Sequence, residues 1–174
     1  MSLVDKDAKH EAKSDSKPFT GYKASILKSD DGFVTNIIGT AGNTCDGNIL
    51  LPLADEKTKN SSRPSKIRGD THYGSAENRF QMSQRGITVV SQIQEGFNKT
   101  RDFKDDMRKR AHIEPKNAEM NRFHGMARAR YWGLPKANIQ FIITAIVVNV
   151  KRLANVIGSV SHLKACQENP FGGN

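Results

Sequence analysis

Alternating and β-branched segments fill the first part of the chain. Residues 21–28 alternate between polar and apolar, and they end at the turn cluster Ser29-Asp-Asp-Gly32. Residues 33–39 follow as a second β-rich run. Two such runs around a turn that contains glycine predict a hairpin. A turn at residues 41–46 then leads to a short predicted helix over about 47–56, and residues 57–65 are polar enough to form a loop.

The middle of the chain alternates between strand and helix patterns. Residues 65–70 predict a short buried strand that ends in an acid, and residues 76–85 predict a helix that stops at Gly86. Residues 87–93 are rich in β-branched side chains and predict a further strand. This order predicts an α/β fold with helices packed on a mixed sheet.

Helical patterns fill the last part of the chain. Residues 102–113 predict a helix, and Pro115 predicts either a kink or a second helix that starts at Pro115 and runs to Gly125. Pro135 begins the last helix, over about residues 135–157, which is apolar on nearly every side and is therefore expected in the core. Its longest apolar run, residues 139–150, is too short for a membrane span. We therefore expect a cytoplasmic protein with no membrane partner.

The two ends of the chain look different from its middle. The first twenty residues are mostly polar and have no periodicity, which is typical of a tail. We expect a polar tail over residues 1–18, one domain over 19–158 and a C-terminal tail over 159–174. Cys45 and Cys166 lie far apart in the sequence, which argues against a zinc site or a disulfide framework.

Positive charge is concentrated in the second half of the chain. The net charge is +9, and residues 101–174 hold thirteen Lys and Arg against six Asp and Glu, so this part carries +7 of it. A basic half indicates a polyanionic partner such as nucleic acid. A solvated basic face is the alternative interpretation.

Two acids, Asp70 and Glu114, are candidate ligands for a metal ion. Asp70 follows a predicted strand, and strand ends present their side chains to a crevice. Glu114 lies at a helix start, where the helix dipole favours negative charge. If the two carboxylates meet, their oxygens suit Mg²⁺. The alternatives are that Asp70 is a turn or cap residue and that Glu114 pairs with Arg110, one helical turn away.

Several segments, in order, resemble the catalytic part of bacterial insertion-sequence transposases with a DDE site. The segment Phe19-Thr-Gly-Tyr-Lys23 is similar to the family's GYK strand, and Gly42-Asn-Thr-Cys-Asp46 is similar to its "GN, two residues, D" turn. Gly69-Asp-Thr-His-Tyr-Gly74 is similar to the block that carries the second catalytic acid. Arg110 and Glu114 match the Arg and Glu of the third-acid motif. The resemblance covers about residues 19–153.

This resemblance implies an RNase H-like fold and a defined set of site residues. Asp70 and Glu114 would be catalytic and would bind Mg²⁺ (or Mn²⁺) in a two-metal site. The phosphates of DNA would be held by arginines, namely Arg110, Arg122, Arg128 and Arg130. The parent enzyme would cleave DNA at the ends of its element, transfer the strand to target DNA and act as a homo-oligomer.

The chain also departs from the family pattern. Met107 stands where the third-acid motif has a Tyr, and Asn121 stands where it has a Lys, with Arg122 adjacent. The first catalytic Asp should precede the GYK strand, but Asp5, Asp7 and Asp15 lie there in a segment without a strand pattern. We therefore expect the first strand and its acid to be missing.

These observations lead to one expected function and two alternatives. We expect a DNA transposase fragment that does not cleave DNA by itself. The first alternative is a nucleic-acid-binding module without chemistry. The second is a basic interaction protein with an open sheet edge, which would aggregate or pair with another chain.

Overall fold

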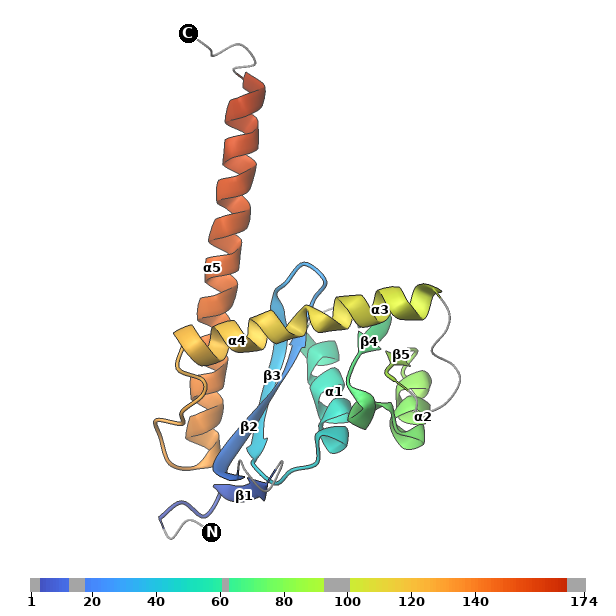
Figure 1. Cartoon of the computed structure of the whole chain (residues 1–174), viewed down its shortest axis with the longest axis vertical. Coiled ribbons are helices and arrows are strands. Elements are labelled where there is room, and N and C mark those ends of the chain that lie inside the picture. Colours follow the sequence, from blue (N-terminus) through green and yellow to red (C-terminus); the bar gives the residue numbers. More distant parts are fainter. Residues whose placement is uncertain (1–3, 13–17, 61–62, 93–100, 169–174) are drawn as a thin grey trace.

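The computed structural model describes residues 4–12, 18–60, 63–92 and 101–168 (Figure 1). Its helices and strands follow the order β1 (Lys9–Ala12), β2 (Pro18–Lys28), β3 (Val34–Ala41), η1 (Asp46–Ile49), α1 (Leu50–Asn60), β4 (Lys66–Arg68), η2 (Thr71–Gly74), α2 (Ala76–Gln84), β5 (Thr88–Val90), α3 (Arg101–Ala111), α4 (Ile113–Phe123) and α5 (Leu134–Glu168). This is the mixed α/β fold that the sequence predicted.

The predicted hairpin is confirmed in β2 and β3. The two strands are antiparallel, and Ser25 lies opposite Ile38. The turn closes with a hydrogen bond from the backbone N–H of Ser29 to the carbonyl of Phe33. Gly32 has a φ of +89° in this turn, a conformation that glycine adopts without a steric penalty. β1 pairs with the other edge of β2, but its register reaches only residues 18–21.

A second, smaller sheet follows. β4 and β5 are parallel, with Ile67 opposite Val89, and α2 forms the crossover between them. Apolar side chains from α1, α2 and both strands close a core beneath this pair, namely Leu50, Ala54, Ile67, Met82, Ile87 and Val89. Among the described residues, β4 pairs with β5 alone, and residues 22–28 of β2 pair with β3 alone. The two sheets are therefore separate.

The helix α5 packs along β3 and forms the main core. Its buried residues Ala137, Phe141, Ala145 and Val148 face Val34, Ile37 and Met120. Polar contacts fix the helix to the strand. The Asn149 side chain accepts from the Val34 N–H and donates to the Val34 carbonyl, both at 2.8 Å, and the Asn138 Oδ1 accepts from the Gly39 N–H at 2.6 Å.

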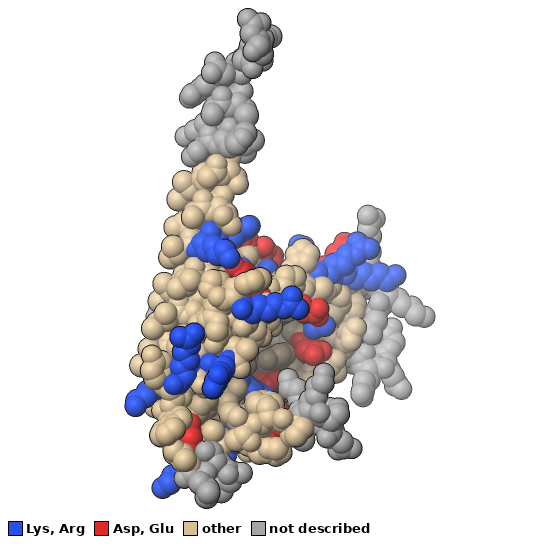
Figure 2. Space-filling view, turned by 60° about the vertical axis from the view of Figure 1, so that its left-hand side comes forward, with Lys and Arg blue, Asp and Glu red and all other residues tan. Residues whose placement is uncertain are grey.

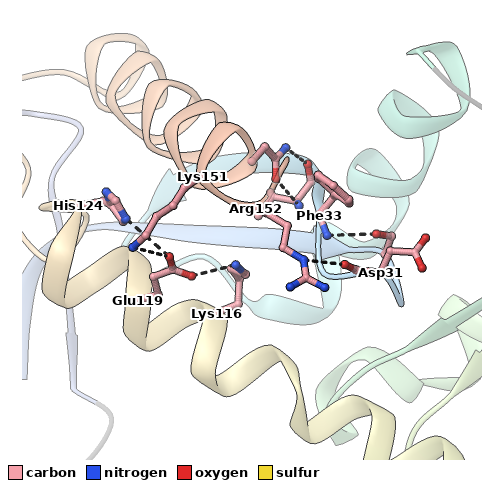
Figure 3. Close-up of polar contacts among 10 residues, drawn as sticks. Asp31, Phe33, Lys116, Glu119, His124, Lys151 and Arg152 are labelled. Atoms are coloured by element: carbon pink, nitrogen blue, oxygen red, sulfur yellow. Dashed lines mark hydrogen bonds and ion pairs between the residues drawn. The ribbon is translucent and has the colours of Figure 1, made fainter. Parts of the chain in front are cut away.

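The helices α3 and α4 run one after the other across the hairpin (Figure 1). The break between them falls at His112, and Pro115 is the third residue of α4, within the first turn, where a missing N–H removes no helix hydrogen bond. Glu119 of α4 accepts from Lys116 at 2.8 Å and from Lys151 of α5 at 3.3 Å (Figure 3). These contacts join α4 to α5.

The predicted polar tail at the N-terminus is wrong for residues 4–12. Asp5 is buried, and its carboxylate accepts from the Tyr22 hydroxyl and from the Gly133 N–H. Asp7 accepts from the Leu134 N–H at 3.0 Å, so both acids lie at the N-terminus of α5, where negative charge is favourable. These acid-to-backbone contacts join residues that are more than 120 positions apart in the sequence. A local pattern of polar and apolar residues therefore cannot predict them.

The predicted absence of a strand before the hairpin is also corrected. The strand β1 is only four residues long, and its acid, Glu11, forms an ion pair with Lys23. Asp15, the remaining acid of this segment, lies outside the described residues.

Two helices are longer than predicted. α1 continues to Asn60, through residues assigned to a loop, and α5 continues to Glu168, through residues assigned to a tail. The apolar character of α5 is also more extensive than residues 139–150. By length and composition alone, residues 134–159 could cross a bilayer, and they form the one such stretch in the part of the chain that the structure describes.

Candidate functional site

Asp70 follows β4 directly and projects from the end of the small sheet. The Gly69 N–H still donates to the Val90 carbonyl at 2.9 Å. Asp70 then leaves the strand and caps η2, because its carboxylate accepts from the Thr71 N–H at 2.7 Å. The side chain remains 58% exposed, so the predicted cap role holds and still leaves carboxylate oxygen open to solvent.

Glu114 comes to the same region from a different element. It is exposed and is the second residue of α4, in the first turn of that helix. Arg110, at the end of α3, lies one helical turn earlier in the sequence. Its Nη1 lies 3.9 Å from Asp70 Oδ1, so the arginine pairs with Asp70, where the sequence suggested Glu114 as its partner.

A cleft of about 960 Å³ joins these residues. Its walls are residues 22–30 of the hairpin, residues 63–70 around β4, and side chains of α3 and α4 that include Arg110, Glu114 and Asn121. Figure 2 shows Lys and Arg side chains spread over a face with a hollow, and Asp and Glu side chains near its edge. Both acids that the sequence singled out therefore line one cleft.

Most other charges of the cleft are engaged in ion pairs. Lys66 and Arg68 project from β4 and donate to the two oxygens of Asp106 at 2.8 and 2.7 Å. Burial acts to raise the pKa of Asp106, but these two hydrogen bonds outweigh it and hold that pKa below its usual value. Arg68 also donates to Asp30 at 3.0 Å.

A second set of ion pairs lies on the hairpin side of the cleft. Lys23 of β2 pairs with Glu11 and, at 3.5 Å, with Asp46. Burial acts to lower the pKa of Lys23, but the hydrogen bond with Glu11 and the nearby Asp46 charge leave it above its usual value. Asp46 is the first residue of η1, and the N-cap residue of that helix, Cys45, makes no side-chain cap hydrogen bond.

The sequence reasoning missed this ion-pair framework. Lys66 and Arg68 are two residues apart on a strand, so they lie on one face of it, and this spacing was a usable signal. Asp106 lies nearly forty residues further along, and its partners could not be read from spacing. Asp5 and Asp7 are visible in the sequence, but their contacts with the start of α5 depend on the tertiary fold.

The three remaining predicted arginines lie apart from the cleft walls. Arg122 ends α4, and Arg128 and Arg130 lie in the segment before α5. All three are exposed, and none of them is among the residues that line the cleft. Gln140 of α5 orders this segment, because it accepts from the Arg130 N–H and donates to the Arg128 carbonyl, both at 2.9 Å.

The carboxylates of the cleft fit one hydrated cation better than a preformed two-metal site. Among the described residues, no group of three or more His, Cys, Asp and Glu side chains is placed to hold a metal ion. Mg²⁺ is commonly bound by one or two carboxylates, with water and substrate phosphates as its other ligands. Asp70 and Glu114 line the same open cleft, and they would be the residues to hold such a cation if their oxygens reach it together.

Comparisons with known proteins identify a family. The family model described as "Transposase DDE domain" matches residues 3–150 of the chain. No curated protein and no solved structure matches it. The matched range includes the hairpin, both walls of the cleft and the first half of α5.

Proposed function

The chain belongs to the transposase DDE domain family, and from this premise we propose that its cleft holds DNA beside a divalent cation. The family acts in DNA transposition and DNA cleavage. The observation that carries the proposal is that Asp70 and Glu114, on separate elements, line one cleft that Arg110 borders. Bacterial insertion-sequence origin and an RNase H-like sheet order are further parts of this proposal.

Each residue of the cleft has a proposed task. Asp70 and Glu114 hold Mg²⁺ or Mn²⁺ through carboxylate oxygens. A cation bound there would make its water more acidic and would stabilise the leaving oxygen of a phosphodiester. Arg110 donates to a phosphate oxygen next to the acids, which aligns the backbone of the DNA. Lys66 and Arg68 keep the cleft open through Asp106.

A second surface would hold the flanking DNA. Arg122, Arg128 and Arg130 are exposed and close in sequence to two exposed aromatic residues, Tyr131 and Trp132, which are 56% and 70% exposed. Arginine pairs with phosphates, and an aromatic ring can stack on an unpaired base. This surface would add affinity without adding sequence preference.

We propose that the chain binds DNA but does not cleave it unaided. Two carboxylates hold one cation weakly, and phosphoryl transfer with two metals requires a fuller set of ligands. The described residues place no third acid with Asp70 and Glu114 in a metal-binding group. The same observation favours the alternative function, a nucleic-acid-binding module in which both acids are structural.

Direct measurement of Mn²⁺ binding separates these two functions. Free Mn²⁺ is followed by electron paramagnetic resonance for the full chain and for Asp70→Asn, Glu114→Gln and Glu77→Gln. Glu77 is an exposed acid on α2 that bonds to Gln81, so it serves as a matched control. We expect each cleft variant to lower Mn²⁺ affinity about tenfold, with no change for the control. Equal binding by all four proteins would support the module without metal chemistry.

A nicking assay on supercoiled plasmid then tests the chemistry. We expect the purified chain to leave the plasmid intact in Mg²⁺ or Mn²⁺. Nicking that depends on the metal and disappears in Asp70→Asn would contradict the proposed inactivity and would show that the described cleft is sufficient for cleavage.

A further inference from the structure

The outer face of α5 carries a long stripe of exposed apolar side chains. Ile139, Ile143, Ile146, Val150 and Leu153 are between 49% and 60% exposed. Ile157 continues the same spacing and is 57% exposed. Globular proteins rarely leave a continuous apolar surface of this length in water without a use for it.

The opposite side of α5 already has its partner. Ala137, Phe141, Ala145 and Val148 are buried against β3 and α4, and at 3.6 residues per turn they lie roughly opposite the stripe. Lys151 and Arg152 also face the body, because they donate to Glu119 at 3.3 Å and to the Asp31 carbonyl at 3.2 Å (Figure 3). The orientation of α5 is therefore fixed, with the stripe pointing away from the body.

The spacing of the stripe is that of a coiled-coil seam. Its six positions are separated by four, three, four, three and four residues. A repeat that averages 3.5 residues matches a second helix at a shallow crossing angle, and β-branched Ile and Val favour such packing. No charged residue occupies any of the six positions, so these positions of two copies can meet without facing like charges.

In the outer half of α5, the side chains of residues 153–159 are not buried against the rest of the described molecule. Every residue from 151 to 159 is exposed, and Figure 1 shows this part of the helix extending beyond the rest of the described molecule. It contains Val156, Ile157 and Gly158, which are poor helix formers. A helix of this composition is marginal in water unless one face packs against another surface.

We propose that the α5 stripe is a self-association surface that packs against the same stripe of a second copy of this chain. Eight exposed aliphatic side chains lie on and beside the stripe, namely Ile139, Ile142, Ile143, Ile146, Val147, Val150, Leu153 and Ile157. At about 80 Å² each, they would bury roughly 640 Å² per copy, approaching the typical ~800 Å² of a stable interface. A bilayer fits less well, since Asn138, Asn149 and Lys151 project from the same helix toward protein groups.

This inference does not depend on the proposed chemistry of the cleft. The stripe lies on the side of α5 that faces away from β3, whereas the cleft lies among β2, β4, α3 and α4. Loss of Mn²⁺ binding and loss of association are therefore separate outcomes with separate variants.

Analytical ultracentrifugation of the full chain tests the proposal. We expect a species of twice the 19.3 kDa chain mass that dissociates on dilution. Ile146→Glu/Leu153→Glu should weaken the association by at least about thirtyfold. Phe123→Glu, which replaces an apolar residue of α4 that is 74% exposed, is the matched control and should associate like the unchanged chain. A monomeric unchanged chain at its highest soluble concentration, or equal loss in the control, would overturn the proposal.

Two further measurements cover the other outcomes. Val150→Cys, with Cys45 and Cys166 changed to Ser, should form a disulfide-linked dimer under mild oxidation, and failure to do so in an associating protein would contradict the seam. Co-sedimentation with phosphatidylcholine vesicles should show no binding. Binding that Ile146→Glu/Leu153→Glu abolishes would assign the stripe to a lipid surface instead.

Discussion

At the scale of single residues, the acids of this protein divide by what they contact. Asp106 is buried and accepts from two cations of β4, and Asp5 is buried against Tyr22 and the start of α5. Asp70 and Glu114, in contrast, are exposed on the walls of a cleft. Removing a buried acid leaves its hydrogen-bond donors without their partner, while exposed acids on a shared cleft are available to a ligand.

Replacing Asp106 should give a loss of stability that depends on pH. The pKa of Asp106 lies below its usual value in the folded protein, so its contribution is fully present above the usual pKa of an aspartate and is lost as the pH falls through the folded value. Asp106→Asn should therefore lower the free energy of unfolding by about 2–4 kcal/mol near pH 7. The difference should shrink as the pH falls below about 4.

Urea denaturation between neutral and acidic pH measures this difference. Asp105→Asn is the control, because Asp105 is 52% exposed and pairs with Arg108 on the surface of the same helix. Such pairs contribute roughly 0–1 kcal/mol. A gap between Asp106→Asn and the unchanged chain that stays constant with pH would contradict the proposed role of the Asp106 charge.

Single residues also show what could be read from the sequence. Asp70 was identified because a strand end and a turn are local features, and the structure places it at such an end. Its catalytic role, like that of Glu114, stays a prediction. Asp106 was not identified, because its importance comes from Lys66 and Arg68, whose contacts exist only after β4 and α3 pack together.

At the scale of elements, the contact between β3 and α5 holds the larger sheet to its helix. A Cβ on Gly39 would lie 2.8 Å from the Phe141 ring and 2.6 Å from Asn138 Oδ1. Gly39 therefore allows the strand backbone to approach the helix, and its N–H bonds to Asn138. The family-matched segment ends within this helix, so the packing lies inside the family domain.

Gly39→Ala should destabilise the protein by about 1–3 kcal/mol, since the added methyl group overpacks this contact. Gly21→Ala is a matched control on β2, because a Cβ there has no atom within 4 Å. Thermal unfolding followed by circular dichroism compares the two variants. Equal melting temperatures would show that α5 can move away from β3 at little cost.

The elements themselves were largely predictable, and their limits were less so. The hairpin, α2 and the break near Pro115 have local signals in turns, caps and proline, and all three are confirmed. β1 was missed because four residues carry too little pattern. The end of α5 was placed too early, because its last part has no buried face among the described residues and so no amphipathic signal.

At the scale of the whole molecule, the cleft lies between two sheets, and no described strand pairs across it. Residues 22–28 of β2 and the strand β4 face the cleft from its two sides, and neither has a recorded strand partner on that side within the described residues. Open strand edges of this kind attract other extended chains. Several charges on the walls, notably Lys23 and Arg68, oppose uncontrolled pairing because they lie on these strands.

The net charge of +9 gives the last prediction, which concerns DNA binding by the whole chain. Each phosphate contact releases counterions, so the logarithm of the affinity for duplex DNA should fall linearly with the logarithm of salt concentration. Arg110→Gln and Arg128→Gln should each reduce that slope by about one. Arg85→Gln should leave the slope unchanged, because Arg85 is held by Asp55 through two hydrogen bonds of 2.7 and 3.0 Å.

Fluorescence anisotropy with a labelled duplex measures the slopes. An Arg85→Gln slope that falls as much as the other two would mean that diffuse charge, and not the cleft and the segment before α5, binds the DNA.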